Sequence, residues 1–152
     1  MRYISFVLLA LGLASASLAA DIDIYTAADL QHLAQSLSVK QGASYADRNL
    51  ARHNNHHLLL VKREATGSSE LHQREADIFV VESGQAAILT GGKMVDGHTT
   101  APGEIRGKSI EGGERHSLAA GDIIHIPAGT PHQVIIENSK PFTYFVVKVS
   151  GQ

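Results

Sequence analysis

Beyond Gly42, short apolar runs alternate with glycine, proline and asparagine, and no other feature of the sequence constrains the fold as strongly. The runs lie at residues 57–63, 77–81, 86–90, 123–126, 134–136 and 144–149. Short runs that are rich in valine, isoleucine and leucine and bounded by turn residues are typical of β-strands. Many such strands favour an all-β sandwich or barrel, and we predict a hairpin turn at Ser83-Gly84 between the second and third of them.

One helix is predicted ahead of the strands. Thr26 has the character of an N-cap residue, and Asp29 stands three residues later as the acid of a capping box. Leucines then recur from Leu30 to Leu37 with the spacing of one helical face. We expect the helix to end by Gly42 and to cover an edge or an end of the β-structure.

The N-terminal residues have the layout of a secretory signal peptide. A positive start at Met1-Arg2 precedes an apolar core at Phe6–Leu13 and a run of small residues. This core is shorter than the roughly 20 residues that a membrane span needs. We therefore expect residues 1–20 to be a cleaved signal peptide, residues 21–50 a helical segment and residues 51–152 the barrel. The protein is then periplasmic or secreted, with no membrane association after cleavage.

Histidine and cysteine content restrict the metal chemistry. The sequence has nine histidines and no cysteine, so any metal site must combine histidine with aspartate or glutamate. The formal net charge is −2, and the basic residues form no dense run. We therefore expect no nucleic-acid partner.

The stretch GDIIHIPAGTPH resembles the second motif of the cupin family. Gly121, Pro127, Gly129 and His132 occupy its four positions: a glycine, then Pro-x-Gly after five residues, then a histidine after two more. Ile136 stands where the family pattern has asparagine. Proline restricts φ and Gly129 supplies backbone freedom, so we expect a stiff loop that presents His132.

The stretch ELHQREADIFVVESG resembles the first cupin motif. His72 stands at its second histidine, Asp77 at its glutamate and Gly84 at its closing glycine, whereas Glu70 replaces the first histidine. The resemblance covers residues 55–149. It implies the cupin double-stranded β-helix, a jelly-roll barrel, preceded here by the short N-terminal helix.

In cupins these motif positions converge on one metal ion inside the barrel. The resemblance implies His72, Asp77 and His132 as ligands, with Glu70 as a fourth, and Mn, Fe, Ni or Zn as the ion. The residues agree, because Glu70 and His72 are two apart on a strand and share a face. The alternative is a metal-free pocket, in which Glu70 and Asp77 form a hydrogen-bonded polar pair.

Two further features remain open at this stage. His125 lies within a predicted strand, where it can line the cavity as an acid or base or lie in the core or at a dimer interface. The polar, glycine-rich residues 91–120 are too long for a structureless loop, so we expect an extra hairpin or a flap over the site.

These features predict a metal-dependent enzyme that acts on a small polar metabolite, as an isomerase, lyase or dioxygenase. Glu70 or His125 is then the candidate catalytic acid or base. The alternatives are a non-catalytic cupin that binds a sugar or organic acid without metal, and a metal-carrying or sensing protein. Cupins are often dimers, so the resemblance also allows a homodimer.

Overall fold

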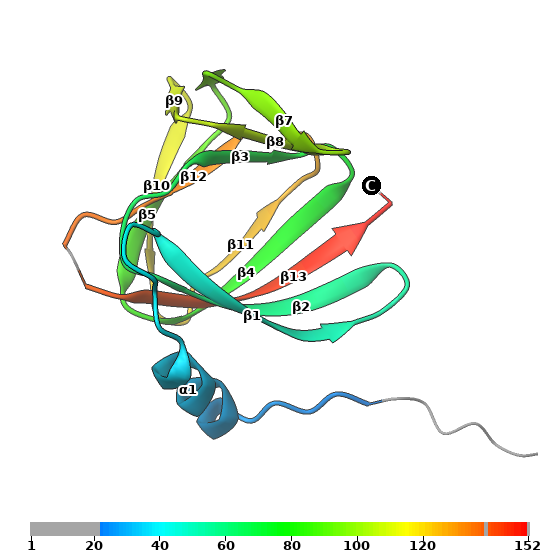
Figure 1. Cartoon of the computed structure of the whole chain (residues 1–152), viewed down its shortest axis with the longest axis vertical. Helices are drawn as coiled ribbons and strands as arrows, with labels where there is room; N and C mark the ends of the chain where they lie inside the picture. The colour runs from blue at the N-terminus through cyan, green and yellow to red at the C-terminus, as the bar shows by residue number, and fades with distance from the viewer. Residues whose placement is uncertain (1–21, 139, 152) are drawn as a thin grey trace, which may run out of the picture.

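The computed structural model describes residues 22–138 and 140–151, which form one helix, α1 (Ala27–Ser36), and thirteen β-strands (Figure 1). The strands are β1 (Tyr45–Arg52), β2 (His56–Arg63), β3 (Ser69–His72), β4 (Glu75–Ser83), β5 (Gln85–Thr90), β6 (Lys93–Val95), β7 (His98–Ala101), β8 (Glu104–Gly107), β9 (Ser109–Glu111), β10 (Glu114–Ala119), β11 (Ile123–Ile126), β12 (His132–Ile135) and β13 (Phe142–Ser150). All six predicted runs are strands, which confirms the all-β class.

Helix α1 begins as the sequence predicts. Thr26 Oγ1 accepts a hydrogen bond from the Asp29 backbone at 3.2 Å, and the Asp29 carboxylate accepts one from the Thr26 backbone at 3.0 Å. The helix ends at Ser36, before Gly42. Lys62 Nζ on β2 donates a hydrogen bond to the carbonyl of Leu37 at 2.9 Å, which ties the helix end to the sheet.

Strand β1 begins at Tyr45, so the sheet extends into the segment 21–50 that we expected to be helical. Most β1 side chains are exposed or half-buried, because β1 is the edge strand and pairs only with β2. An edge strand with little buried surface needs few apolar residues, and a search for apolar runs therefore misses it.

Two antiparallel sheets curve around a common interior (Figure 1). The first has the strand order β1-β2-β13-β4-β11, and the second has the order β10-β5-β12-β3-β8-β7. A separate two-stranded sheet joins β6 and β9. This arrangement is the predicted jelly-roll barrel, in which strands distant in sequence lie side by side.

The interior is filled by apolar side chains from both sheets. Val61, Phe79 and Tyr144 of the first sheet and Ile88 and Val134 of the second are buried in one cluster. Each such burial stabilises the fold by about 1.5–3 kcal/mol. The apolar cluster therefore holds the two sheets together around the polar residues described below.

The prediction of a hairpin at Ser83-Gly84 is wrong. Strand β4 lies in the first sheet and β5 in the second, so the turn is a corner at which the chain crosses between sheets. Gly84 has a φ of +83°, and a Cβ there would overlap the carbonyl oxygen of Pro141 and lie 3.1 Å from Phe142 Cα. Turn residues signal a change of direction, but they do not reveal which strands then pair.

The segment 91–120 is strand-rich. It contains β6 to β10, and β7 and β8 form the extra hairpin that the sequence predicts. Strand β8 also pairs with β3 in the second sheet, which places residues of this segment next to Glu70 and His72.

Residues 1–20 lie outside the described residues, so the signal peptide stays a prediction. Across residues 22–138 and 140–151, the structure has no helix that is long and apolar enough to cross a membrane.

Candidate functional site

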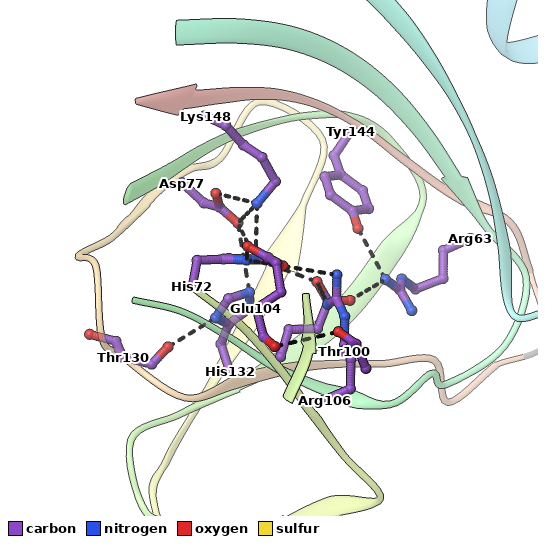
Figure 2. Close-up of polar contacts among 11 residues, drawn as sticks. Arg63, His72, Asp77, Thr100, Glu104, Arg106, Thr130, His132, Tyr144 and Lys148 are labelled. Atoms are coloured by element: carbon purple, nitrogen blue, oxygen red, sulfur yellow. Dashed lines mark hydrogen bonds and ion pairs between the residues drawn. The ribbon is translucent and has the colours of Figure 1, made fainter. Parts of the chain in front are cut away.

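Register between strands brings the two motifs together. Glu70 and His72 lie two apart on β3, and β12 pairs with β3 so that His132 is directly opposite Glu70. His72 and His132 are each almost fully buried, and their rings lie 5.3 Å apart between centroids. Glu70 and His72 of the first motif and His132 of the second therefore meet inside the barrel. Figure 2 shows the two histidines side by side.

His132 has one nitrogen that is bonded and one that is free. Its Nδ1 donates a hydrogen bond to the backbone carbonyl of Thr130 at 3.1 Å. Its Nε2 is buried and has no hydrogen-bond partner among the residues that the structure describes. Burial lowers the pKa of His132, which favours the neutral ring. The Nε2 lone pair is therefore available to a ligand inside the barrel.

The loop before His132 is anchored as the sequence predicts. Gly129 has a φ of +77°, a conformation that favours glycine. Its backbone N–H donates to the carbonyl of His72 at 2.7 Å, so the loop is bonded directly to β3.

His72 is oriented by a carboxylate from the segment 91–120. Glu104 lies opposite His72 on β8, and both of its carboxylate oxygens are 2.8 Å from His72 Nδ1. A carboxylate that accepts from Nδ1 orients the ring and leaves Nε2 toward the interior, as is common for metal-bound histidines.

Glu70 is held by two arginines. Arg106 lies directly opposite on β8 and forms an ion pair with Glu70, and Arg63 Nη2 lies 3.5 Å from the other carboxylate oxygen. Burial alone would raise the pKa of Glu70, but the hydrogen bond to His72 and the charges of Arg106 and Arg63 outweigh it and hold the pKa well below its usual range. Glu70 is therefore a permanently charged carboxylate and too weakly basic to act as a general base near neutral pH.

Asp77 is paired with a lysine. Asp77 and Lys148 are cross-strand neighbours on β4 and β13, and Lys148 Nζ donates to the two Asp77 oxygens at 2.7 and 2.9 Å. Burial opposes the charge on Asp77, but the hydrogen bond to His72 and the Lys148 charge lower its pKa overall. The carboxylate is thus ionised and engaged by an internal cation.

Lys148 also contacts His72. Its Nζ lies 2.9 Å from His72 Nε2, so only one of these two nitrogens can hold the proton between them. Burial opposes the charge on His72, but hydrogen bonds to the Asp77 and Glu70 carboxylates outweigh burial and raise the pKa of His72 to about 9.

The residues present fit a metal ion. Glu70, His72 and His132 each offer one ligand atom, and these three atoms lie within 4.8 Å of one another. His72 Nε2 is 3.6 Å from Glu70 Oε2, whereas two atoms about 2.1 Å from one ion at the tetrahedral angle are about 3.4 Å apart. Asp77 Oδ2 lies nearby, at 3.4 Å from His72 Nε2 and 3.7 Å from His132 Nε2, but it is bonded to Lys148.

Two cavities adjoin these residues. The outer one, which we call the mouth cavity, has a volume of about 770 Å³, and its wall includes His72, Glu104, Arg106 and Lys148. The inner one has a volume of about 170 Å³, and its wall includes Glu70, Arg106 and Lys148. Arg106 and Lys148 line both, so these two side chains separate the two cavities.

His125 takes no part in this site. It is exposed, whereas the next residue on β11, Ile126, is buried. Since successive side chains of a strand point to opposite faces, His125 lies on the outside of the barrel and borders a separate hollow with His116. Our expectation that His125 can serve as an acid or base in the cavity is therefore wrong.

The sequence analysis missed four charged residues of the site: Arg63, Glu104, Arg106 and Lys148. Lys148 had a readable signal, because it follows Tyr144 and Val146 at alternate positions of an apolar run and so faces inward. Glu104 and Arg106 had no such signal in the sequence, because their position beside His72 and Glu70 depends on the pairing of β8 with β3.

Comparisons with known proteins agree with this fold. A family model for the cupin domain matches residues 102–148. The structure resembles a double-stranded β-helix protein from Klebsiella pneumoniae, with a TM-score of 0.59 and 17% identity over 87% of this chain and 93% of that one. It also resembles a cupin 2 conserved barrel domain protein from Salinispora arenicola, with a TM-score of 0.51 and 18% identity over 87% and 90% of the two chains.

A third similar structure is KdgF from Halomonas sp., with a TM-score of 0.50 and 15% identity over 72% of this chain and 82% of that one. No curated protein matches the sequence significantly. The family match over residues 102–148 and the similar solved structures show that the chain has the cupin double-stranded β-helix fold. Its barrel contains two histidines and a glutamate, His72, His132 and Glu70, whose potential ligand atoms lie close together.

Proposed function

We propose that the barrel binds one divalent metal ion, Mn, Fe, Ni or Zn, and that the protein is a metal-dependent enzyme for a small polar substrate. The observation that carries the proposal is His132 Nε2, a buried nitrogen without a partner among the described residues, which lies with Glu70 and His72 in one possible ligand group. Leaving such a group unsatisfied costs about 1–3 kcal/mol, so an occupant is favoured.

The protein's own residues prepare this centre. Glu104 and the Thr130 carbonyl each accept from the Nδ1 of one histidine and thereby direct both Nε2 atoms inward. Glu70 supplies a carboxylate that stays ionised between its two arginines. A bound ion would supply Lewis-acid polarisation of a substrate carbonyl or hydroxyl oxygen. The mouth cavity of about 770 Å³ gives a small metabolite access to His72 and Glu104, which line it.

Isomerase, lyase and dioxygenase chemistry all suit two histidines and one carboxylate with open positions. Of the two catalytic candidates from the sequence, His125 lies outside the barrel and Glu70 is too weakly basic. We therefore propose Glu70 as a metal ligand. The signal-peptide pattern of residues 1–20 supports a periplasmic or secreted enzyme.

A second candidate function is a non-catalytic cupin that binds a sugar or organic acid without metal. The observation in its favour is charge balance, because Glu70 is paired with Arg63 and Arg106, and Asp77 with Lys148. In this case the same polar groups bind the ligand directly.

Elemental analysis of the protein, purified without chelator and without a histidine tag, tests the proposal. The His72→Ala/His132→Ala double variant removes two ligands. His125→Ala is the matched control, since it removes a histidine of the second motif region that lies outside the barrel. We expect near-stoichiometric metal in the wild type and the control and none in the double variant.

A wild type that contains no metal after reconstitution with Mn²⁺, Fe²⁺, Ni²⁺ or Zn²⁺ would refute the metal site. A thermal shift with one member of a sugar or organic-acid panel would then support the binding module.

A further inference from the structure

We infer that Lys148 competes with the metal ion for the centre, and that its ammonium group withholds Asp77 from the ion and weakens metal binding. This inference rests on the proposed metal site. Two ligand sets are possible, in which His72 and His132 are joined by either Asp77 or Glu70. The inference assigns Glu70 as the carboxylate ligand.

The first argument is geometric. Lys148 Nζ contacts both Asp77 oxygens, at 2.7 and 2.9 Å, and His72 Nε2 at 2.9 Å (Figure 2). His72 Nε2 is the atom that would ligate the ion, and it cannot contact Lys148 Nζ at 2.9 Å and a metal ion at the same time. Metal binding therefore requires Lys148 to leave His72.

The second argument is electrostatic. The Asp77 side chain is 2% exposed and that of Lys148 is 17% exposed, so little solvent screens their charges. An ammonium group that remained beside Asp77 would repel a divalent cation a few ångströms away, because both are positive and the barrel interior has a low effective dielectric. The same ammonium group neutralises the Asp77 carboxylate that would otherwise attract the ion.

The third argument is that Lys148 has room to move. Its side chain lines both the inner cavity and the mouth cavity. Once displaced from His72, the ammonium group can turn toward the mouth cavity, where a substrate oxygen would enter. Arg106, the other residue common to both cavities, is held by its ion pairs with Glu70 and Glu104.

Zn²⁺ titration in competition with a chromophoric chelator tests this inference. Lys148→Met removes the charge and the hydrogen bonds, and Lys148→Gln removes the charge but keeps a donor for Asp77. Lys108→Met is the matched control, because Lys108 is exposed and distant in sequence from both motifs. We expect both Lys148 variants to bind Zn²⁺ about tenfold or more tightly than the wild type, and the control to bind it unchanged.

Lys148→Met leaves a buried carboxylate without its cation and can fail to fold; circular dichroism and thermal unfolding report this, and Lys148→Gln then carries the test. Equal or weaker Zn²⁺ binding by the folded Lys148 variants would overturn the inference while the wild-type affinity leaves the metal site intact. If neither the wild type nor any variant binds Zn²⁺, the titration is repeated with Mn²⁺, Fe²⁺ and Ni²⁺, and a lack of binding to all four ions refutes the proposed site and the inference with it.

Discussion

Stability of the metal-free protein is expected to fall as the pH rises from about 6.5 to about 9, because His72 loses a proton that the folded state holds. The ordinary pKa of histidine is 6.5, and the surrounding carboxylates raise the pKa of His72 to about 9. The folded protein therefore binds this proton more tightly than the unfolded chain does. The resulting stabilisation is fully present below pH 6.5 and disappears as the pH rises through 9.

The magnitude follows from the size of the pKa difference. One pKa unit corresponds to about 1.4 kcal/mol, so the free energy of unfolding is expected to drop by about 3 kcal/mol across this range. Screening by water reduces this figure little, since the His72 side chain is 3% exposed. The lowered pKa values of His57 and His132 act below pH 6.5, where burial of a neutral ring opposes protonation. These two histidines therefore do not contribute to the change in the free energy of unfolding between pH 6.5 and 9, which comes from His72.

Urea unfolding at a series of pH values, with a chelator present, measures this change. His72→Asn removes the titrating group while keeping a polar side chain, and its stability is expected to vary much less between pH 6.5 and 9. The reasoning is refuted if wild-type stability is flat or increases over this range, or if the variant shows the same decrease.

Two substitutions test other parts of the architecture. Glu104→Gln keeps an acceptor for the buried imidazole but removes the charge, and we expect Zn²⁺ affinity to fall by about 10–100-fold in the chelator assay, with the exposed Glu111→Gln unchanged. Equal affinities would show that Glu104 does not orient a ligand. Gly84→Ala would force a Cβ against the backbone of Pro141, and we expect a loss of about 3 kcal/mol or more in urea unfolding. Gly42→Ala has the same φ of +83° with open space around it and is expected to cost only about 1–2 kcal/mol; similar losses in both would mean that the close approach at Gly84 is unimportant.

The sequence could predict the parts of the site that lie in local motifs. Alternation along β4 puts Asp77 on the same face as the apolar Phe79, and both are buried. The glycine and proline pattern before His132 predicted a stiff loop, and Gly129 indeed adopts a positive φ. In each case, the information lies within about ten residues of the chain, where turn chemistry and strand periodicity act directly.

The partners of these residues could not be predicted, because they depend on register between distant strands. Glu104 reaches His72 only because β8 pairs with β3 with these two residues opposite each other. A shift of that pairing by one residue would place Glu104 on the other face of the sheet. The prediction for His125 was wrong for a simpler reason. Its strand was predicted correctly, but the side of the strand on which it lies was not decided, although alternation with the apolar Ile126 indicates it.

Glu70 and the segment 91–120 are best understood together. A buried carboxylate without a cation is destabilised by several kcal/mol, so glutamate in place of the first motif histidine requires a compensating charge. Arg106 provides it from β8, directly opposite Glu70, and Arg63 reaches the second oxygen from β2. A histidine at position 70 would instead face two arginines with no negative charge between them. The two arginines therefore explain how a glutamate can be buried at position 70, where the cupin pattern has a histidine.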